Sequence, residues 1–398
     1  MNFVAIKMLV GDRAKYIGIL IGVTFASLLI TQQAAIFCGL MTRTFGAITD
    51  MGQPDIWVMD KKVQFIDDVK PMQDTELFRV RGVSGVQWAV PLYKGLIRAR
   101  LDNGTFQTCN VLGLDDATLI GGPPKMVPDP NGVMGRLEDL RRSEAVIVDR
   151  AAADDKLAKI PTDAAGRPIP GAAHVPLKIG DTLELNDHRA VVVGMCQVSR
   201  TFQSQPTVYT TYERATTFAP QERKLLSFVL VKAAPGVDKT DLCKRITETT
   251  GLGAFTATQF IWKTVNYFME NTGIPINFGI SVALGFFVGT VIAGQTFYNF
   301  TLDNLKHFGC LKAMGADSVT LLKMILIQAL LVGSIGYGLG VGLASVFGAL
   351  TANSELAFWM PWQLLIISAV AVTLICVIAS IISLTKVLRL EPAIVFKG

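Results

Sequence analysis

Residues that commonly perform chemistry are sparse in this sequence of 398 residues. It contains three histidines, His174, His188 and His307, and none stands at metal-ligand spacing from a cysteine or another histidine. The G-x-S-x-G motif of a serine nucleophile does not occur. No Gly-Lys dipeptide occurs either, and a Walker A phosphate loop requires one. We therefore expect a non-catalytic chain that holds no metal and does not hydrolyse ATP by itself.

The positions of the six cysteines leave their oxidation state open. Three of them lie in or beside strongly apolar segments: Cys38, Cys310 and Cys376. The other three, Cys109, Cys196 and Cys243, are not closely spaced. At most one disulfide can form among these three, which would leave one free thiol. The alternative is that all of them are small buried apolar side chains.

Long apolar segments dominate the composition. Hydrophobic residues make up 51% of the chain and charged residues only 17%, against about 25% charged in a typical soluble domain. Four runs lack Asp, Glu, Lys and Arg altogether: Tyr16–Thr42, Asn271–Leu302, Met324–Ser354 and Leu356–Thr385. Each exceeds the roughly 20 residues that a helix needs to cross the hydrocarbon core. Four transmembrane helices are predicted, with core helices of a soluble protein as the alternative.

The first apolar run has a second interpretation, as a cleaved signal peptide. Its length exceeds the apolar core of such a peptide, which is about 7–15 residues. The sequence therefore favours an uncleaved membrane anchor.

The distribution of basic residues predicts the orientation, because lysine and arginine accumulate on the cytoplasmic side. Residues 43–270 carry 28 basic and 27 acidic side chains. The remaining basic residues all fall on one side of a four-pass chain: Lys7, Arg13, Lys15, Lys306, Lys312, Lys323, Lys386, Arg389 and Lys397. We expect both termini in the cytoplasm and residues 43–270 on the other side of the membrane. The formal charge of +5 then reflects topology, and no nucleic-acid partner is expected.

The predicted fold class is an all-α four-helix transmembrane domain with a large α+β periplasmic domain inserted between its first and second helices. The expected order is a cytoplasmic amphipathic helix 1–15, transmembrane helix 16–42, periplasmic domain 43–270, transmembrane helix 271–302, cytoplasmic helix 303–317, transmembrane helix 318–350, periplasmic loop 351–359, transmembrane helix 360–385 and cytoplasmic tail 386–398. For residues 1–15, an ordinary basic flank of the first crossing is the alternative.

The middle segment shows strand and turn signals. Leu96–Leu101 and Thr105–Leu114 flank Asn103-Gly104, which predicts a β-hairpin because Asn-Gly accepts the positive φ angles of a tight turn. Further short strands are expected at Ile56–Met59, Val86–Val90, Ala145–Val148, Ala190–Met195, Thr207–Tyr209 and Phe228–Val231. Helices are expected at Asp74–Val80 and Asp238–Thr249, and a loop at Pro161–Pro176.

Residues 303–323 predict a short helix, a break and a new helix. Leu302, Leu305, Phe308 and Leu311 form an apolar stripe at three-residue steps. Gly315 can end this helix in the left-handed conformation, and Asp317 or Ser318 can cap the next one. The alternative is a tight helical hairpin without a partner.

Glycine pairs at small-xxx-small spacing predict close helix packing. These pairs are Gly18 with Gly22 and Gly338 with Gly342, and the pattern does not say whether the neighbour belongs to the same chain. The four apolar runs contain no Asp, Glu, Lys, Arg or His, which disfavours proton- or ion-driven transport. A pump built on this chain would need an outside energy source.

Three motifs carry a family resemblance. The segment His307–Ala316, HFGCLKAMGA, resembles the cytoplasmic motif of FtsX-like/MacB-type ABC transporter permeases. Leu388–Ala393 is similar to the family's terminal R-L-[DE]-P-A signature, and Ile179–Leu183 with Val191–Met195 resembles an element of its periplasmic core domain. Order and layout match over essentially the whole chain. The stand-alone form is most similar to DevC- or Lol-type permeases. One departure is Lys306-His307, where the family often has Arg-Glu.

The resemblance implies a homodimer of permeases on two ABC ATPase subunits. The ATPase would bind ATP and Mg, so this chain would hold no cofactor. A coupling helix would dock on the ATPase through these residues: Leu305, Lys306, His307, Phe308, Leu311, Lys312, Met314 and Gly315. Further implied partners are membrane lipids, a periplasmic adaptor protein and a TolC-like outer-membrane channel. Transport of a lipid-like, peptide or drug substrate would proceed by mechanotransmission.

Two other classes of function remain as alternatives. One is an FtsX-like transmembrane regulator that activates a periplasmic partner without transport. The other is a membrane-anchored external enzyme, which the lack of a catalytic cluster disfavours.

Overall fold

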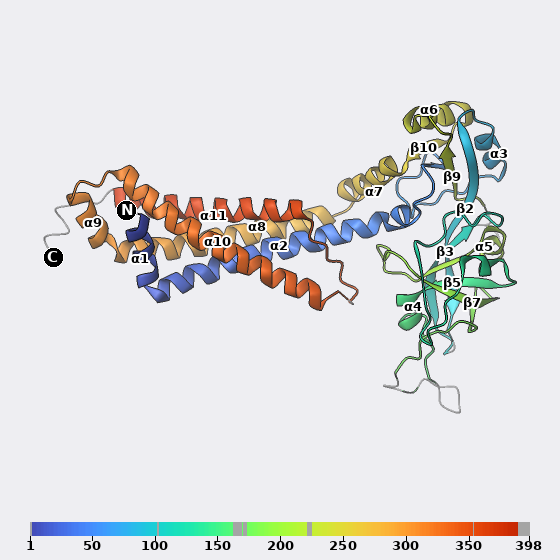
Figure 1. Ribbon diagram of the computed structural model, residues 1–398, viewed down its shortest axis with the longest axis horizontal. Helices are drawn as coiled ribbons and strands as arrows, with labels where there is room; N and C mark the ends of the chain where they lie inside the picture. The colour runs from blue at the N-terminus through green and yellow to red at the C-terminus, as the bar shows by residue number, and fades with distance from the viewer. Residues whose placement is uncertain are drawn as a thin grey trace. The chain divides into compact units, whose positions relative to one another are not determined.

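The computed structural model describes residues 2–101, 103–161, 169, 173–220, 225–352 and 354–388. Parts of the expected loop Pro161–Pro176 and most of the expected tail 386–398 lie outside them. Contacts divide the chain into two compact units (Figure 1). The helical unit comprises Met1–Leu40 and Thr272–Gly398, and the α+β unit comprises Met41–Asn271.

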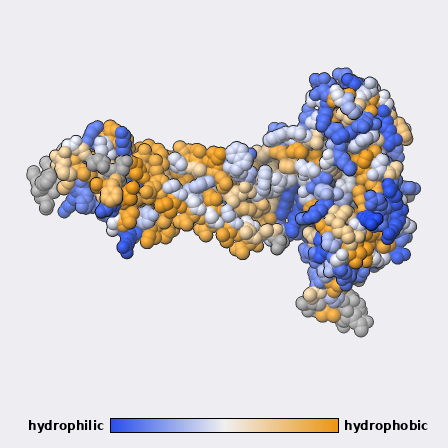
Figure 2. All heavy atoms as spheres, viewed as in Figure 1, coloured by the Kyte–Doolittle hydropathy of each residue, from blue (hydrophilic) through white to orange (hydrophobic). Residues whose placement is uncertain are grey.

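The helical unit is built from α1 Asn2–Gly11, the first part of α2 Arg13–Asp50, α8 Ile274–Asp303, α9 Leu305–Ala313, α10 Ser318–Leu350 and α11 Trp362–Leu388. Within the described residues, four helices are long and apolar enough to cross a membrane: Arg13–Asp50, Ile274–Asp303, Val319–Leu350 and Trp362–Ser383. Figure 2 shows hydrophobic residues over most of the visible surface of this unit, whereas hydrophilic residues spread over the α+β unit.

The N-terminal residues form two helices rather than the single helix expected over 1–15. Helix α1 ends at Gly11, and α2 begins at Arg13. The Asp12 side chain accepts a hydrogen bond from the Lys15 backbone N–H at 3.3 Å, as an N-cap residue does. Helix α2 then continues to Asp50, beyond the apolar run that ends at Thr42. A charged residue ends an apolar run, but it does not end a helix.

Small side chains bring the helices of this unit close together. A Cβ at Gly340 would lie 2.5 Å from the Ser27 Cβ, so only glycine permits α10 to approach α2 this closely. The alanines at the centre of the bundle are fully buried: Ala26, Ala293, Ala329 and Ala379. Such contacts are typical of helices that associate in lipid.

The α+β unit holds ten strands in one sheet within its described residues. Its elements are β1 Ile56–Met59, α3 Thr75–Arg81, β2 Val86–Arg100, β3 Phe106–Leu114, β4 Lys125–Val127, η1 Leu137–Arg141, β5 Ala145–Asp149, α4 Arg150–Asp154, β6 Thr182–Leu185, β7 His188–Gln197, β8 Thr207–Thr211, α5 Tyr212–Phe218, β9 Phe228–Ala233, α6 Lys239–Thr250, β10 Gly253–Thr256 and α7 Ala257–Asn271. The expected strands and both expected helices are confirmed.

The strand order is β10-β1-β9-β2-β3-β8-β5-β7-β4, and β6 pairs with β2 and β7. In the first four strands, β9 lies antiparallel between β1 and β2, while β1 lies antiparallel between β9 and β10. With α3 and α6 as the connections, this is a pair of split βαβ units. The strands of the second half of the sheet, β3 to β8, lie between β2 and β9 in the sequence.

The long strand β2 belongs to both halves of the sheet. Its residues Val86–Leu92 pair with β9, and its residues Tyr93–Arg100 pair with β3. The β2–β3 pairing confirms the hairpin expected around Asn103-Gly104, where Gly104 has a φ of +80°. One strand therefore provides continuous backbone hydrogen bonding across the unit.

Large apolar side chains fill the α+β unit. One cluster contains Trp57, Tyr209, Phe228 and Phe260, all at most 1% exposed. Two further clusters lie beneath α4–α5 and beneath α3–α6. Cys109, Cys196 and Cys243 are each buried and are not bonded to one another. Burial raises the pKa of the Cys109 thiol to about 12, so this side chain is a buried apolar group at neutral pH.

Candidate functional site

Helix α9 lies between the apolar helices α8 and α10, and both of its ends are defined. At its start, Asn304 donates a side-chain hydrogen bond to the Phe300 carbonyl at 2.9 Å. At its end, Gly315 has a φ of +95°, as expected from the sequence. The Gly315 and Ala316 N–H groups bond to the Lys312 and Leu311 carbonyls, which completes a Schellman motif. The turn that follows therefore has a fixed direction.

Phe308 is the clearest correction to the sequence prediction. A docking residue must present its side chain to a partner, but Phe308 is fully buried within this chain. It packs in one cluster with Ala5 of α1 and with Leu321, Met324 and Ile325 of α10. Its apolar ring therefore stabilises the attachment of α9 to α10 and is not available to a second protein.

The exposed face of α9 carries other residues of the predicted set. Lys306, His307 and Gly315 are exposed, and Met314 is 75% exposed. Leu305, Leu311 and Lys312 are half-buried. The exposed set also includes Cys310, which was not among the predicted docking residues. The apolar periodicity therefore marks the side of the helix that packs inside this chain.

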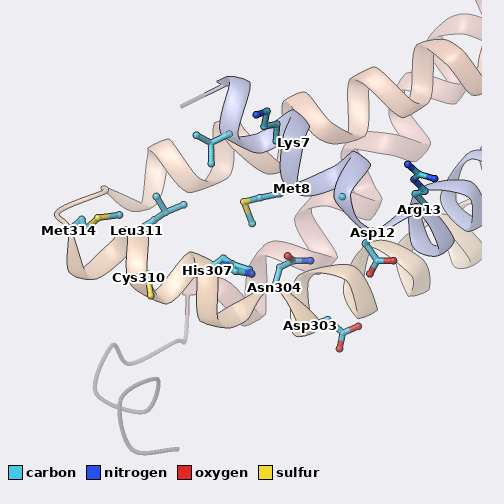
Figure 3. Close-up of a pocket in the computed structure, with 12 residues that line it drawn as sticks. Lys7, Met8, Asp12, Arg13, Asp303, Asn304, His307, Cys310, Leu311 and Met314 are labelled. Atoms are coloured by element: carbon cyan, nitrogen blue, oxygen red, sulfur yellow. The ribbon is translucent and has the colours of Figure 1, made fainter.

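A pocket of about 830 Å³ lies between α1 and α9. Met8 on α1 and Leu311 on α9 border this space, with His307 and Asn304 along one side (Figure 3). Its full lining is Val4, Lys7, Met8, Gly11, Asp12, Arg13, Asp303, Asn304, His307, Cys310, Leu311 and Met314. Three of the eight predicted docking residues, His307, Leu311 and Met314, thus face a space that α1 helps to form.

Three charged residues join the start of α2 to the end of α8 beside this pocket. The Lys15 ammonium lies 2.8 Å from Asp12 Oδ2 and also contacts the Asp303 carboxylate. The hydrogen bond from Lys15 holds the pKa of Asp12 below its ordinary value. All three residues lie near the ends of apolar runs. In the sequence, only that position indicated that these side chains could meet.

Helix α1 is fixed to α10 by a polar contact in an apolar setting. The Gln328 side-chain amide is fully buried and donates to the Ala5 carbonyl at 2.7 Å. Ala5 and Leu9 are also fully buried, whereas Phe3, Val4 and Val10 are exposed. The expected amphipathic helix thus has one apolar side against α10 and α9, and further apolar residues outside.

The four predicted packing glycines differ in their surroundings. A Cβ at Gly22 would lie 2.5 Å from Ile292 on α8, whereas one at Gly18 would make an ordinary contact with Thr296. Among the described residues, no atom lies within 4 Å of a Cβ built at Gly338 or Gly342. The close approach of α10 to α2 comes instead from Gly336 and Gly340, which form a second pair at the same spacing.

Within the described residues, no group of three or more His, Cys, Asp or Glu side chains is arranged to hold a metal ion.

Two family models match this chain. The model for the MacB-like periplasmic core domain matches residues 17–249, and the model for the FtsX-like permease C-terminal matches residues 279–392. The chain belongs to the FtsX-like/MacB-type ABC transporter permeases. It is therefore a multi-pass membrane permease, and its family implies an ATPase partner.

Two relatives and two solved structures are similar to this chain. An uncharacterized ABC transporter permease of Methanocaldococcus jannaschii is 24% identical over 56% of this chain, and the match spans 58% of that protein. An uncharacterized ABC transporter permease of Mycobacterium tuberculosis is 24% identical over 82% of this chain and 80% of that protein. The periplasmic region of MacB from Actinobacillus actinomycetemcomitans is 16% identical, covering 56% of this chain and 96% of that one, with a TM-score of 0.34. The extracellular domain of YknZ, a noncanonic ABC-type transporter from Gram-positive bacteria, is 14% identical. The match covers 51% of this chain and 98% of that one, with a TM-score of 0.31.

Proposed function

We propose that this permease couples ATP hydrolysis by a separate ATPase subunit to the export or extraction of a lipid-like, peptide or drug substrate at the periplasmic side of the bacterial inner membrane. ATP and Mg bind to the ATPase in this proposal, and the permease works by mechanotransmission. The observation that carries it is the placement of α9. This short helix is rigidly attached on one side and exposed on the other, between two membrane-length helices.

The attachment of α9 gives a route for force. Phe308 shares one buried cluster with Leu321, Met324 and Ile325 of α10, so displacement of α9 displaces the start of α10. Close-packed interiors transmit strain because they have few voids to absorb it. The hydrogen bonds of the Schellman turn at Gly315 make the connection between α9 and α10 rigid. In this proposal, ATPase movement reaches the membrane helices through that contact.

The exposed face of α9 is the proposed ATPase-docking surface. Met314 supplies the large apolar side chain, and Lys306 and His307 supply polar contacts. Interfaces gain most of their affinity from a few central side chains, with charged rims adding orientation. Leu311 and Lys312 contribute through the parts of their side chains that remain accessible.

The second face of α10 supports the proposed homodimer. A Cβ built at Gly338 or Gly342 would have open space around it within the described residues, and Leu339 and Leu343 beside them are about half exposed. Small residues at this spacing let another helix approach closely in lipid. A second permease copy is the proposed neighbour. Membrane lipids cover the remaining apolar surface, which includes Ile276 and Ile367.

The orientation and outer partners belong to the same proposal. Lys7, Arg13, Lys306 and Lys312 all lie on helices or turns at one end of the predicted four-pass topology, which the positive-inside rule assigns to the cytoplasm. The α+β unit then faces the periplasm. A periplasmic adaptor protein and a TolC-like outer-membrane channel are its proposed partners there.

Replacement of single residues on α9 tests the docking surface. Met314→Asp should lower the amount of ATPase that copurifies with the permease by about tenfold or more, because loss of a central contact costs about 2 kcal/mol. Membrane insertion and thermal stability should not change. The matched control is Phe106→Asp, which also replaces an exposed apolar side chain with a charged one, but in the α+β unit.

Phe308→Asp separates docking from folding. Because Phe308 is buried, this variant should lose thermal stability even without the ATPase present. Full ATPase binding by Met314→Asp, together with a stable Phe308→Asp protein that fails to bind, would contradict the proposed docking surface.

A further inference from the structure

The loop between β7 and β8, residues 198–206, contacts two helices of the α+β unit that lie far apart in sequence. We call it the strut loop. One of these helices is α2, whose residues from Met41 to Asp50 belong to this unit and whose earlier residues belong to the helical unit. The other is α7, which ends at Asn271, immediately before the helical unit resumes at Thr272. The α+β unit has these two covalent connections to the helical unit.

The contact with α2 is made at three successive turns of the helix. Arg43 Nη1 donates to Ser204 Oγ at 3.1 Å. A Cβ at Gly46 would lie 2.7 Å from the Ser199 Cβ, so glycine is needed for this approach. The Asp50 carboxylate accepts two hydrogen bonds at 2.8 Å, from the Ser199 backbone N–H and the Ser199 hydroxyl. The last turns of α2 are therefore held at three positions.

The contact with α7 is aromatic. The rings of Phe202 in the strut loop and Phe268 in α7 have centroids 4.9 Å apart. Phe268 also packs against Phe65 and Tyr267, whose rings are the third and fourth members of the cluster. Aromatic pairs at such distances add to the stability gained from burial. The strut loop thus connects the second helix through a cluster of four rings.

The strut loop itself is held in a strained conformation. Ser204 has a φ of +50°, which non-glycine residues rarely adopt. Its carbonyl accepts a hydrogen bond from Lys156 Nζ at 2.6 Å, and its N–H bonds to the Thr201 carbonyl. The Pro206 carbonyl accepts from the Asn110 N–H of β3, which attaches the loop to the sheet. Strain of this kind persists only where surrounding contacts over-determine it.

We propose that the strut loop is the positioning element that holds α2 and α7 in one fixed arrangement against the sheet, so that movement of either helix turns the whole α+β unit. Arg43, Asp50, Ser199 and Phe202 are its positioning residues. The proposal rests on the mechanotransmission function proposed above. It predicts that the strut remains closed throughout the transport cycle and that breaking it separates ATP hydrolysis from movement of the α+β unit.

A reversible cross-link tests this directly. The double variant Asp50→Cys/Ser199→Cys replaces two side chains whose oxygens are hydrogen-bonded at 2.8 Å, and oxidation is intended to put a disulfide in place of this contact. The full-length permease with its ATPase is assembled in lipid nanodiscs. Fluorophores introduced as unnatural amino acids at Phe106 and Leu350, both exposed, report the distance between the two units by energy transfer. Mass spectrometry verifies the intended disulfide.

The expected result depends on the redox state of one polypeptide. With the cysteine pair reduced, the ATP-driven change in energy transfer should fall by about threefold or more, while the ATP hydrolysis rate stays within about twofold of the parent protein. After oxidation, the change should return to the parent value. Arg43→Lys should behave like the parent because it keeps a donor for Ser204, whereas Arg43→Ala should behave like the reduced pair.

Several outcomes would overturn the inference. A reduced pair with the full ATP-driven change would show that the contact is not needed. An oxidised pair that stays defective would show that the strut must open during the cycle. If the parent protein binds no ATPase or shows no ATP-driven change, the proposed function fails and this inference fails with it. If the inference alone is wrong, the parent protein still binds the ATPase and shows the ATP-driven change, and only the variants depart from the expected results.

Discussion

The two units of this permease fill their interiors with different residues. In the α+β unit, Trp57, Phe228 and Phe260 pack their rings within about 6 Å of one another at the centre of the largest cluster. In the helical unit, the closest contacts occur at glycines, as where Gly340 meets Ser27 and Gly336 meets Val23. The helical unit also buries large rings, at Phe297, Phe300 and Phe308, but its helices approach one another most closely at small residues.

The difference follows from the solvent of each unit. In water, burial of apolar surface is the main driving force, so large side chains stabilise most. In lipid, the surroundings are as apolar as the interior, so close backbone approach and dispersion contacts must hold helices together. The comparison predicts that truncating large residues harms the α+β unit most, and that enlarging small residues harms the helical unit most.

Phe228→Ala should give the largest effect. The Phe228 side chain is fully buried against Trp57 and Phe260, so its loss leaves a cavity and should destabilise the α+β unit by about 3–5 kcal/mol. Hydrogen exchange in β9 measures this locally. Phe106→Ala, at a site 64% exposed, is the control and should change stability by no more than about 0.5 kcal/mol. Equal effects at the two sites would refute the packing argument.

The partly buried carboxylate of Asp149 should give the second-largest effect on stability, and this effect depends on pH. Burial raises the pKa of Asp149 to about 6, and the N–H groups of Ala151 and Ala152 only partly oppose this. Between its ordinary pKa and this value, the folded state binds more protons than the unfolded state, so stability falls as pH rises through about 6. Ionisation of Asp149 should therefore lower the free energy of unfolding by up to about 3 kcal/mol at pH 7 relative to pH 4.

Asp149→Asn isolates that pH dependence. The amide has nearly the same shape without the charge, so this variant should be more stable than the parent at pH 7 and equal to it near pH 4. Hydrogen exchange of β5, measured from pH 4 to 7 and corrected for intrinsic rates, provides the comparison. A pH profile unchanged by the substitution would show that Asp149 does not titrate in this range.

Gly340→Ala tests the opposite rule in the helical unit. The added methyl group would lie 2.5 Å from the Ser27 Cβ and 2.8 Å from the Leu28 nitrogen, so the variant should lose about 1–3 kcal/mol. Gly338→Ala is the matched control, two residues away on the same helix but with open space around it. Thermal unfolding of the dissociated chain in detergent should separate the two, and equal losses would contradict the assignment of faces.

Helix capping should give the smallest effect. The Asp238 side chain accepts hydrogen bonds from the N–H groups of Thr240 and Asp241, so Asp238→Ala should destabilise α6 by about 1 kcal/mol. Asp317 stands at the same position before α10 but makes no such bond through its side chain. Asp317→Ala should therefore have little effect on stability. A comparable loss in both variants would mean that capping does not distinguish the units.

Local features of the fold could be predicted from the sequence. The hairpin at Asn103-Gly104, the left-handed end at Gly315 and the Asp238 cap each depend on residues a few positions apart. The four apolar helices follow from length and composition alone. In all these cases the backbone conformation is set by neighbours in the chain.

The candidate site was less predictable, because its key property is what covers each residue. The apolar stripe through Leu305, Phe308 and Leu311 is the same whether it packs inside the chain or against a partner, and only the tertiary contact with α10 shows that Phe308 is internal. The glycines of α10 pose the same problem. Gly336 with Gly340 and Gly338 with Gly342 have identical spacing, but only the first pair meets a helix of this chain.

The shared strand β2 has a practical consequence for dissecting this protein. Its 15 residues would extend about 50 Å, and the two halves of the sheet are each hydrogen-bonded to a different portion of it. A truncation that separates the halves would leave one of them with an open edge that invites aggregation. Recombinant fragments should keep this strand whole, and reporter insertions belong at the exposed tip near Gly104, where backbone pairing ends.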